Sequence, residues 1–64
     1  MESFLRLPEV ERRTGLKKSI LYKKIDCGEF PKPIRLTEKA RAWLESEVSS
    51  WIRAKIAESR REAA

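Results

Sequence analysis

The chain has 64 residues, a formal net charge of +5 and an isoelectric point of about 9.8. A chain of this length allows one domain and leaves little surface to bury, which excludes a large enclosed substrate cavity. Any ligand is therefore expected to bind on the outside of the protein.

The positive charge is concentrated in the middle of the chain. Residues 1–11 carry one basic and three acidic side chains, residues 12–41 carry ten basic and three acidic ones, and residues 42–64 carry four of each. The net charges of the three segments are therefore −2, +7 and 0. A basic segment of this kind favours a polyanion as partner, and a solvated charged face is the alternative.

Cys27 is the single cysteine of the chain, which contains no histidine. An intramolecular disulfide is thus excluded, a reducing cytoplasm is the expected compartment, and Cys27 has no companion for a metal site. We expect this side chain to be buried or half-buried. The apolar runs are too short for a signal peptide or a membrane span.

The first predicted elements are a short strand and a helix. Phe4-Leu5-Arg6 alternates apolar and polar residues and is expected to add a strand to the edge of a small sheet. Leu7, Val10 and Thr14 have helical spacing. Pro8 suits the first helical turn because its missing N–H group costs nothing there.

A second helix is predicted after a turn at Gly15. A glycine here can adopt the left-handed conformation that a sharp turn between helices needs, and Leu16 is expected to fill the turn. Leu21 and Ile25 form the buried stripe of the second helix, and Gly28 is its expected C-terminal cap. Two short helices joined in this way have the layout of a helix-turn-helix, whose second helix enters a DNA groove.

A β-hairpin is predicted next. Phe30 is expected to fold back on the core, and Pro31-Lys32-Pro33 excludes helix and holds the chain extended. Residues 34–36 alternate as a strand, residues 37–40 form the expected loop, and residues 41–43 return as the partner strand. This basic hairpin is interpreted as a wing.

The last third of the chain is predicted to be helical. Val48, Trp51, Ile52 and Ile56 recur at the spacing of one helix face, and Trp51 is expected to share one core with Trp43. Beyond this stripe the helix is expected to project into solvent and to fray.

The predicted fold class is a small α+β domain over residues 1–64, with an ordered core at about residues 4–57 and a frayed C-terminal tail. Its architecture is a winged helix-turn-helix with a short β-hairpin wing and a C-terminal helix. The absence of a long heptad seam predicts a monomer in free solution.

The second helix carries most of the candidate DNA-binding residues. Its lysines are Lys17, Lys18, Lys23 and Lys24. Their long stems are expected to reach phosphates on either side of a groove and to supply affinity. Ser19 is the candidate for a base or phosphate contact, and a hydroxyl bonded to its own backbone is the alternative. Ile20 is the candidate for contact with a thymine methyl, and burial in the core is the alternative.

Tyr22 and the wing complete the candidate set. The Tyr22 ring is expected to rest on the domain while its hydroxyl bonds a phosphate, and a purely packing tyrosine is the alternative. The wing cations are Arg35, Lys39 and Arg41, and an arginine in a narrow minor groove reads DNA shape without touching base edges. Arg35 and Arg41 are alternatively solvated strand charges.

Arg12 and Arg13, near the end of the first helix, favour the helix dipole where they stand, and contact with a DNA phosphate is their second interpretation.

Catalysis finds no support in the sequence. Ser19 and Lys23 stand four residues apart, but this pair has no third group and no pocket. We therefore expect that this protein is not an enzyme and that it uses no metal or other cofactor.

Several short segments carry a family likeness from Phe4 to about Ile56. They are Phe4-Leu5-Arg6-Leu7, Thr14-Gly15-Leu16 followed by Ser19, Leu21 and Tyr22, residues 28–36, Ala42-Trp43, Ser46-Glu47-Val48 and Trp51-Ile52. In this order they make the chain similar to the AlpA-type prophage regulators. These are small members of the MerR-like winged helix-turn-helix superfamily, which also contains phage excisionases.

The resemblance implies DNA binding by the second helix in the major groove and by the wing at the adjacent minor groove. It also implies a role in a mobile element, as a regulator of integrase expression or as a recombination directionality factor that steers integrase toward excision. The implied partners are double-stranded DNA, integrase and neighbouring copies of the chain on DNA.

Lys17 departs from the pattern of the family, in which many relatives place serine at the expected N-cap of the second helix. A lysine cannot accept the exposed amide hydrogens of the first turn, and its charge opposes the positive end of the helix dipole. A nearby phosphate would offset both penalties, so a lysine at this position is expected to be favourable mainly in a complex with DNA.

Two classes of function fit the sequence. The first is a sequence-specific DNA-binding regulator. The second is a protein-interaction adaptor, in which the helix-turn-helix is only a scaffold and the last helix binds a partner such as integrase. The charge of +7 on residues 12–41 favours the first.

Overall fold

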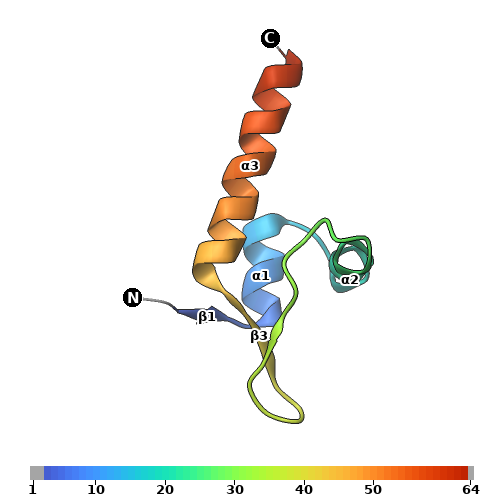
Figure 1. The fold of residues 1–64 in the computed structure, drawn as a ribbon, viewed down its shortest axis with the longest axis vertical. Helices are drawn as coiled ribbons and strands as arrows, with labels where there is room; N and C mark the ends of the chain where they lie inside the picture. The colour runs from blue at the N-terminus through green and yellow to red at the C-terminus, as the bar shows by residue number, and fades with distance from the viewer. Residues whose placement is uncertain (1–2, 64) are drawn as a thin grey trace.

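The computed structural model of the chain describes residues 3–63, so that residues 1, 2 and 64 of the predicted domain lie outside the described part. The elements follow in the order strand, helix, helix, strand, strand and helix (Figure 1). They are β1 (Phe4–Leu5), α1 (Leu7–Thr14), α2 (Lys18–Asp26), β2 (Ile34–Arg35), β3 (Arg41–Leu44) and α3 (Glu45–Ala63). The chain thus has the predicted small α+β fold, compatible with a winged helix-turn-helix.

The three strands form one antiparallel sheet in the order β1-β3-β2. Phe4 lies opposite Leu44, and Arg35 lies opposite Arg41. β1 is therefore the predicted edge strand, while β2, β3 and the loop between them form the predicted hairpin, which is called the wing below. Figure 1 shows the wing loop at the end of the molecule opposite to the C-terminus of α3.

The turn between α1 and α2 is organised by Thr14 and Gly15. The Thr14 hydroxyl donates a hydrogen bond to the Val10 carbonyl oxygen at 2.8 Å and accepts one from the Leu16 N–H at 3.2 Å. Gly15 has a φ of 74°, in the left-handed region where a side chain is unfavourable. The predicted glycine turn is confirmed.

The C-terminal end of α2 is a Schellman motif. Gly28 has a φ of 75° and follows the C-cap residue Cys27. Its N–H donates to the Ile25 carbonyl at 3.1 Å, and the Glu29 N–H donates to the Lys24 carbonyl at 2.8 Å. This pair of bonds defines the motif and confirms Gly28 as the residue that ends the helix.

One hydrophobic core lies between the helices and the sheet. Its buried residues are Leu5, Val10, Leu21, Ile25, Phe30, Trp43 and Val48. The Phe30 ring lies edge to face against both tryptophans, with centroid distances of 6.5 Å to Trp43 and 4.9 Å to Trp51. Phe30 therefore joins the two tryptophans into one core, as predicted.

Both tryptophans also fix the segment that leads from α2 to the wing. The Trp43 indole N–H donates to the Pro31 carbonyl oxygen at 2.9 Å, and the Trp51 indole N–H donates to the Glu29 carbonyl oxygen at 2.7 Å. Because these bonds hold the connecting segment on β3 and α3, they also set the position of α2 relative to the wing.

Two details of the predicted packing are wrong. Cys27 is exposed, because it stands two residues after the core residue Ile25 and thus about 200° around the helix axis from it. Ile56 is 45% exposed, because this part of α3 has already passed beyond the core. Residues 53–62 are all exposed, so α3 projects into solvent as expected (Figure 1). Its fraying stays a prediction, since the helix continues to Ala63.

Candidate nucleic-acid interface

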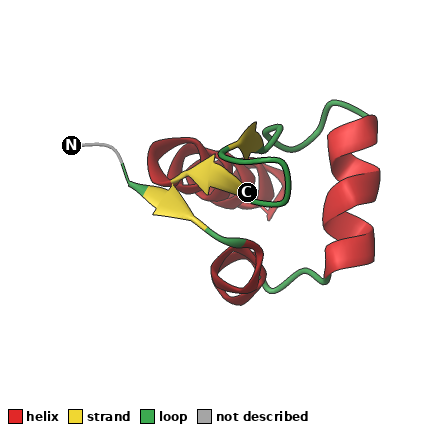
Figure 2. Cartoon of the chain, turned by 90° about the horizontal axis from the view of Figure 1, so that it is seen from below, coloured by secondary structure: helices red, strands yellow, loops and turns green. Residues whose placement is uncertain are grey.

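α2 runs along one edge of the molecule, apart from the sheet and from the other two helices (Figure 2). Leu21 and Ile25 attach it to the core, with exposed fractions of 0% and 9%. Because these two residues form a narrow stripe, most of the remaining helix surface is accessible to a ligand.

Most of the predicted DNA-binding residues of this helix are exposed. They are Lys17, Lys18, Ser19, Ile20 and Lys23. Ile20 is 45% exposed, so burial in the core, the alternative considered for this residue, is wrong. An exposed isoleucine between lysines presents an apolar group on a charged surface, as contact with a thymine methyl requires.

Tyr22 and Lys24 lie at the margin of the exposed surface. The half-buried Tyr22 ring meets the Trp43 ring edge to face, with centroids 6.4 Å apart, so it rests on the domain as expected. The Lys24 ammonium lies 3.6 Å from the Glu29 carboxylate. Lys24 thus already has an anionic partner, which makes it the weakest phosphate-binding candidate of the four lysines.

The N-terminus of α2 is capped from α1. Lys17 is the N-cap residue, with φ −84° and ψ 162°, and its side chain makes no capping hydrogen bond. The Glu11 carboxylate accepts a hydrogen bond from the Lys18 backbone N–H at 3.0 Å. Glu11 therefore supplies the acceptor and the negative charge that Lys17 lacks, so part of the penalty assigned to Lys17 is offset without DNA.

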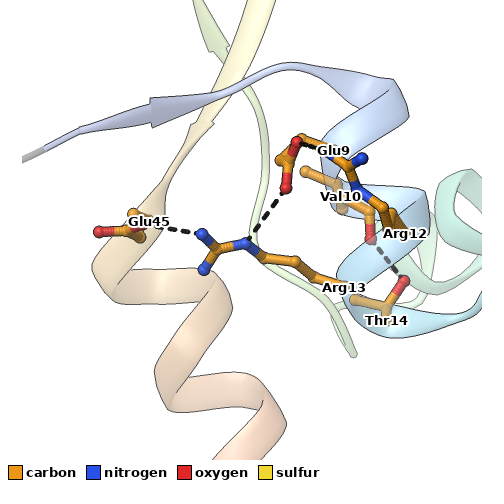
Figure 3. Close-up of polar contacts among 6 residues, drawn as sticks. All are labelled: Glu9, Val10, Arg12, Arg13, Thr14 and Glu45. Atoms are coloured by element: carbon orange, nitrogen blue, oxygen red, sulfur yellow. Dashed lines mark hydrogen bonds and ion pairs between the residues drawn. The ribbon is translucent and has the colours of Figure 1, made fainter.

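Ion pairs of α1 occupy both of its arginines (Figure 3). Arg13 lies 3.1 Å from the Glu45 carboxylate at the start of α3 and 3.7 Å from that of Glu9. Arg12 also pairs with Glu9. The Arg13–Glu45 pair ties α1 to α3, while the two pairs with Glu9 lie within α1. Both arginines thus have a structural role, in addition to their favourable place at the end of α1.

The cationic residues of the wing, Arg35, Lys39 and Arg41, are exposed. Arg35 and Arg41 face each other across β2 and β3, and like charges in this position repel. Within residues 3–63, the ion pairs involve other basic residues and leave these three without a carboxylate partner. An anion bound at the wing would relieve this repulsion.

A groove of about 510 Å³ lies between the helix-turn-helix and the wing, where the start of α1 and Tyr22 of α2 line it on one side. Its polar lining consists of Arg6, Tyr22, Glu38, Lys39 and Arg41. The sequence prediction missed Arg6, because the alternation that assigns it to a short strand says nothing about which other elements lie beside it. The groove brings this residue together with Tyr22 and two of the predicted wing cations.

None of the helices within residues 3–63 combines the length and the apolar composition that crossing a membrane requires. The same residues contain no group of three or more acidic, cysteine or histidine side chains that could hold a metal ion. The catalytic pair considered from the sequence, Ser19 and Lys23, lies on the exposed surface of α2.

The sequence is similar to those of known proteins. Residues 3–56 match the family described as prophage CP4-57 regulatory protein (AlpA), and this segment includes all the elements except the end of α3. The chain is also similar to the uncharacterized protein ORF88 of Enterobacteria phage P4. The two are 47% identical over 60 residues, which is 94% of this chain and 68% of the phage protein. The chain therefore belongs to the AlpA family of prophage regulatory proteins.

Proposed function

We propose that this protein binds double-stranded DNA in a sequence-specific way and thereby regulates a prophage or a related integrative element. The observation that carries the proposal is the exposed cationic surface formed by α2 and the wing of a helix-turn-helix fold. Membership of a family of regulatory proteins supports it. In this proposal the protein acts in the cytoplasm, without catalysis and without a cofactor.

In this proposal α2 enters the major groove. Ser19 and Ile20 contact base edges, because they lie near the front of the helix. Lys17, Lys18 and Lys23 contact phosphates and supply affinity without reading sequence.

The wing lies at the adjacent minor groove. Arg35 inserts there and reads the width of the groove, which depends on sequence. Lys39 and Arg41 add positive charge beside it. Tyr22 contacts a phosphate through its hydroxyl while its ring stays on Trp43.

The biological outcome takes one of two forms. The protein either regulates transcription of the integrase gene or acts with integrase as a recombination directionality factor. Footprinting on the integrase promoter and on the attachment-site DNA of the source element distinguishes the two. Protection of the promoter alone supports the transcriptional role, and protection of the attachment site supports the excision role. Protection of neither, at concentrations that saturate other DNA, contradicts sequence-specific control of this element.

A second candidate function is that of a protein-interaction adaptor. Residues 53–62 of α3 project from the core, and Ile56 on this segment is 45% exposed. An exposed helix with an apolar residue offers a surface for a partner such as integrase. Ile56→Glu, which replaces the exposed apolar residue, should abolish integrase binding if the protein is an adaptor, and should leave DNA binding intact if the first proposal holds.

A further inference from the structure

We propose that the groove between the helix-turn-helix and the wing binds a phosphodiester group of the DNA backbone, and that Arg6 is one of its phosphate-binding residues. This inference rests on the proposed function and extends it to a residue outside the helix-turn-helix and the wing. It follows from the geometry of DNA, from the lining of the groove and from the position of Arg6.

The geometry of DNA requires a backbone to pass between the two reading elements. The major and minor grooves of a duplex are separated by one sugar-phosphate strand on each side. When α2 lies in the major groove and the wing lies at the adjacent minor groove, the strand between them must run between α2 and the wing. The groove of about 510 Å³ opens among Tyr22 of α2, the start of α1 and the wing, so it lies on the path of this strand.

The lining of the groove has the chemistry of a phosphate site. Arg6 comes from the junction of β1 and α1, Tyr22 from α2, Lys39 from the wing loop and Arg41 from β3. Three cations and a phenol thus converge from four parts of the chain. Glu38 also lines the groove, so the lining carries three positive charges and one negative charge, a net charge of +2.

Glu38 does not neutralise the cations of the groove. Among residues 3–63, the ion pairs leave Arg6, Lys39 and Arg41 without a carboxylate partner, although Glu38 lines the same groove. Their guanidinium and ammonium groups therefore keep their hydrogen-bond donors available. Arginine in particular matches the two oxygens of a phosphate with paired donors.

Arg6 also stands where a helix disfavours a cation. It is the N-cap residue of α1, makes no side-chain capping bond and lies at the positive end of the helix dipole. Its backbone is held in place, because its carbonyl oxygen accepts hydrogen bonds from the Glu9 and Val10 N–H groups at 3.0 Å each. An anionic ligand would account for an exposed cation at this unfavourable position on a backbone that is held in place.

The first test replaces Arg6 by glutamine and measures binding to specific and to random duplexes over a range of salt concentrations. Arg6→Gln should weaken binding to both by about tenfold at low salt and reduce the slope of log K against log salt by about one. Arg60→Gln, which removes the same charge from the projecting part of α3, should leave the slope unchanged. Lys39→Gln should weaken DNA binding and reduce the salt slope in the same way as Arg6→Gln. Because Lys39 lies in the exposed wing loop, this variant tests the groove even if Arg6→Gln impairs folding.

The outcomes separate this inference from the proposed function. If the unaltered chain binds no DNA at low salt, both fail. If it binds, and Lys23→Ala weakens binding while Arg6→Gln and Lys39→Gln behave like Arg60→Gln, only the groove proposal is overturned.

A second test locates the phosphate and distinguishes the DNA backbone from free phosphate. The test uses duplexes in which a single phosphate is replaced by a neutral methylphosphonate group. At one position in the duplex, this replacement should lower the affinity of the unaltered chain but should not lower the affinity of the Arg6→Gln variant any further. Inorganic phosphate should compete with DNA no better than chloride at equal ionic strength. Two results together would overturn the proposal and assign the groove to a free anion. Inorganic phosphate would compete more strongly than chloride with DNA for the unaltered chain but not for Arg6→Gln, and the methylphosphonate effects would be the same in both proteins.

Discussion

Arg6 and Lys17 place a positive charge at the N-caps of α1 and α2, where serine, threonine, aspartate and asparagine are preferred. At α2 the Glu11 carboxylate bonds the Lys18 N–H and offsets part of the loss. In the proposed function, folding stability and phosphate binding therefore oppose each other at these helix starts. The opposition can be measured at a single residue, because Lys17 is exposed and its replacement disturbs no core contact.

Lys17→Ser should raise the free energy of unfolding by about 0.5 to 1 kcal/mol, because serine accepts an amide hydrogen bond that lysine cannot. The same change should weaken binding to random DNA. Urea denaturation and a DNA titration measure the two effects. A loss of stability, or unchanged DNA binding, would contradict the account. Glu11→Ala provides the control, since it should destabilise the original chain more than the Lys17→Ser variant.

The residues that read DNA should differ from those that hold it. Lys23→Ala should weaken binding to specific and random duplexes alike and reduce the salt slope by about one. Substitution of Ser19 or Ile20 should change the ratio of specific to random binding by about 1 to 3 kcal/mol for each lost base contact. Titrations against matched specific and scrambled duplexes measure both. If Ser19 and Ile20 variants keep full discrimination while Lys23→Ala abolishes it, the reading face is assigned wrongly.

At the scale of the elements, the sequence predicts the helices and strands well because their signals are local. The spacing of Leu21 and Ile25 defines the inner face of α2, and both residues are buried. The wing loop lacks an Asn-Gly pair, yet Thr37 organises it by accepting hydrogen bonds from the Lys39 and Ala40 N–H groups at 3.3 and 3.0 Å. Hydrogen bonds to a side-chain hydroxyl can thus stabilise a turn that has no Asn-Gly pair. The sequence therefore predicted where the loop lies but not which interactions stabilise it.

The contacts between elements could not be predicted from the sequence. The Glu11 bond to Lys18 depends on how α1 and α2 cross, and the place of Arg6 beside the groove depends on where the wing returns. The error at Ile56 has the same origin, because periodicity shows which face of α3 is apolar but not where the core ends. The predicted DNA-binding residues could be found from a local sequence pattern. The groove could not, because it forms between elements that only the fold brings together.

The core should respond unequally to the loss of its two tryptophans. Trp43 is 1% exposed, so Trp43→Ala should cost about 3 to 5 kcal/mol and unfold so small a domain. Trp51 is half-buried, so Trp51→Ala should cost less, about 2 to 3 kcal/mol. Ile56→Ala, at an exposed position of α3, is the control and should have little effect. Urea denaturation followed by circular dichroism compares them, and an unchanged midpoint for Trp51→Ala would contradict the shared core.

At the scale of the whole molecule, the charge is divided between two ends. α2 and the wing carry the cationic surface, while residues 42–64, which contain α3, have four basic and four acidic side chains. The acidic side chains Glu45 and Glu47 lie at the start of α3, so its projecting part, residues 53–62, carries four basic and two acidic side chains and a net charge of +2.

We expect the protein to be a monomer in free solution and to bind DNA with successive half-sites as several copies. The exposed part of α3 has one large apolar residue, Ile56, which is too little for a stable coiled-coil dimer. Sedimentation velocity without and with such a duplex measures both states. A tight dimer in the absence of DNA would contradict the expectation.

The salt dependence of binding to a random duplex tests the central claim most directly. If four to six cations of α2, the wing and the groove contact phosphates, log K should fall with log salt with a slope of about −4 to −5. The proposed DNA-binding surface predicts measurable binding at low salt and this steep loss at moderate salt. Absence of binding to any duplex at low salt would contradict it and would favour the adaptor function.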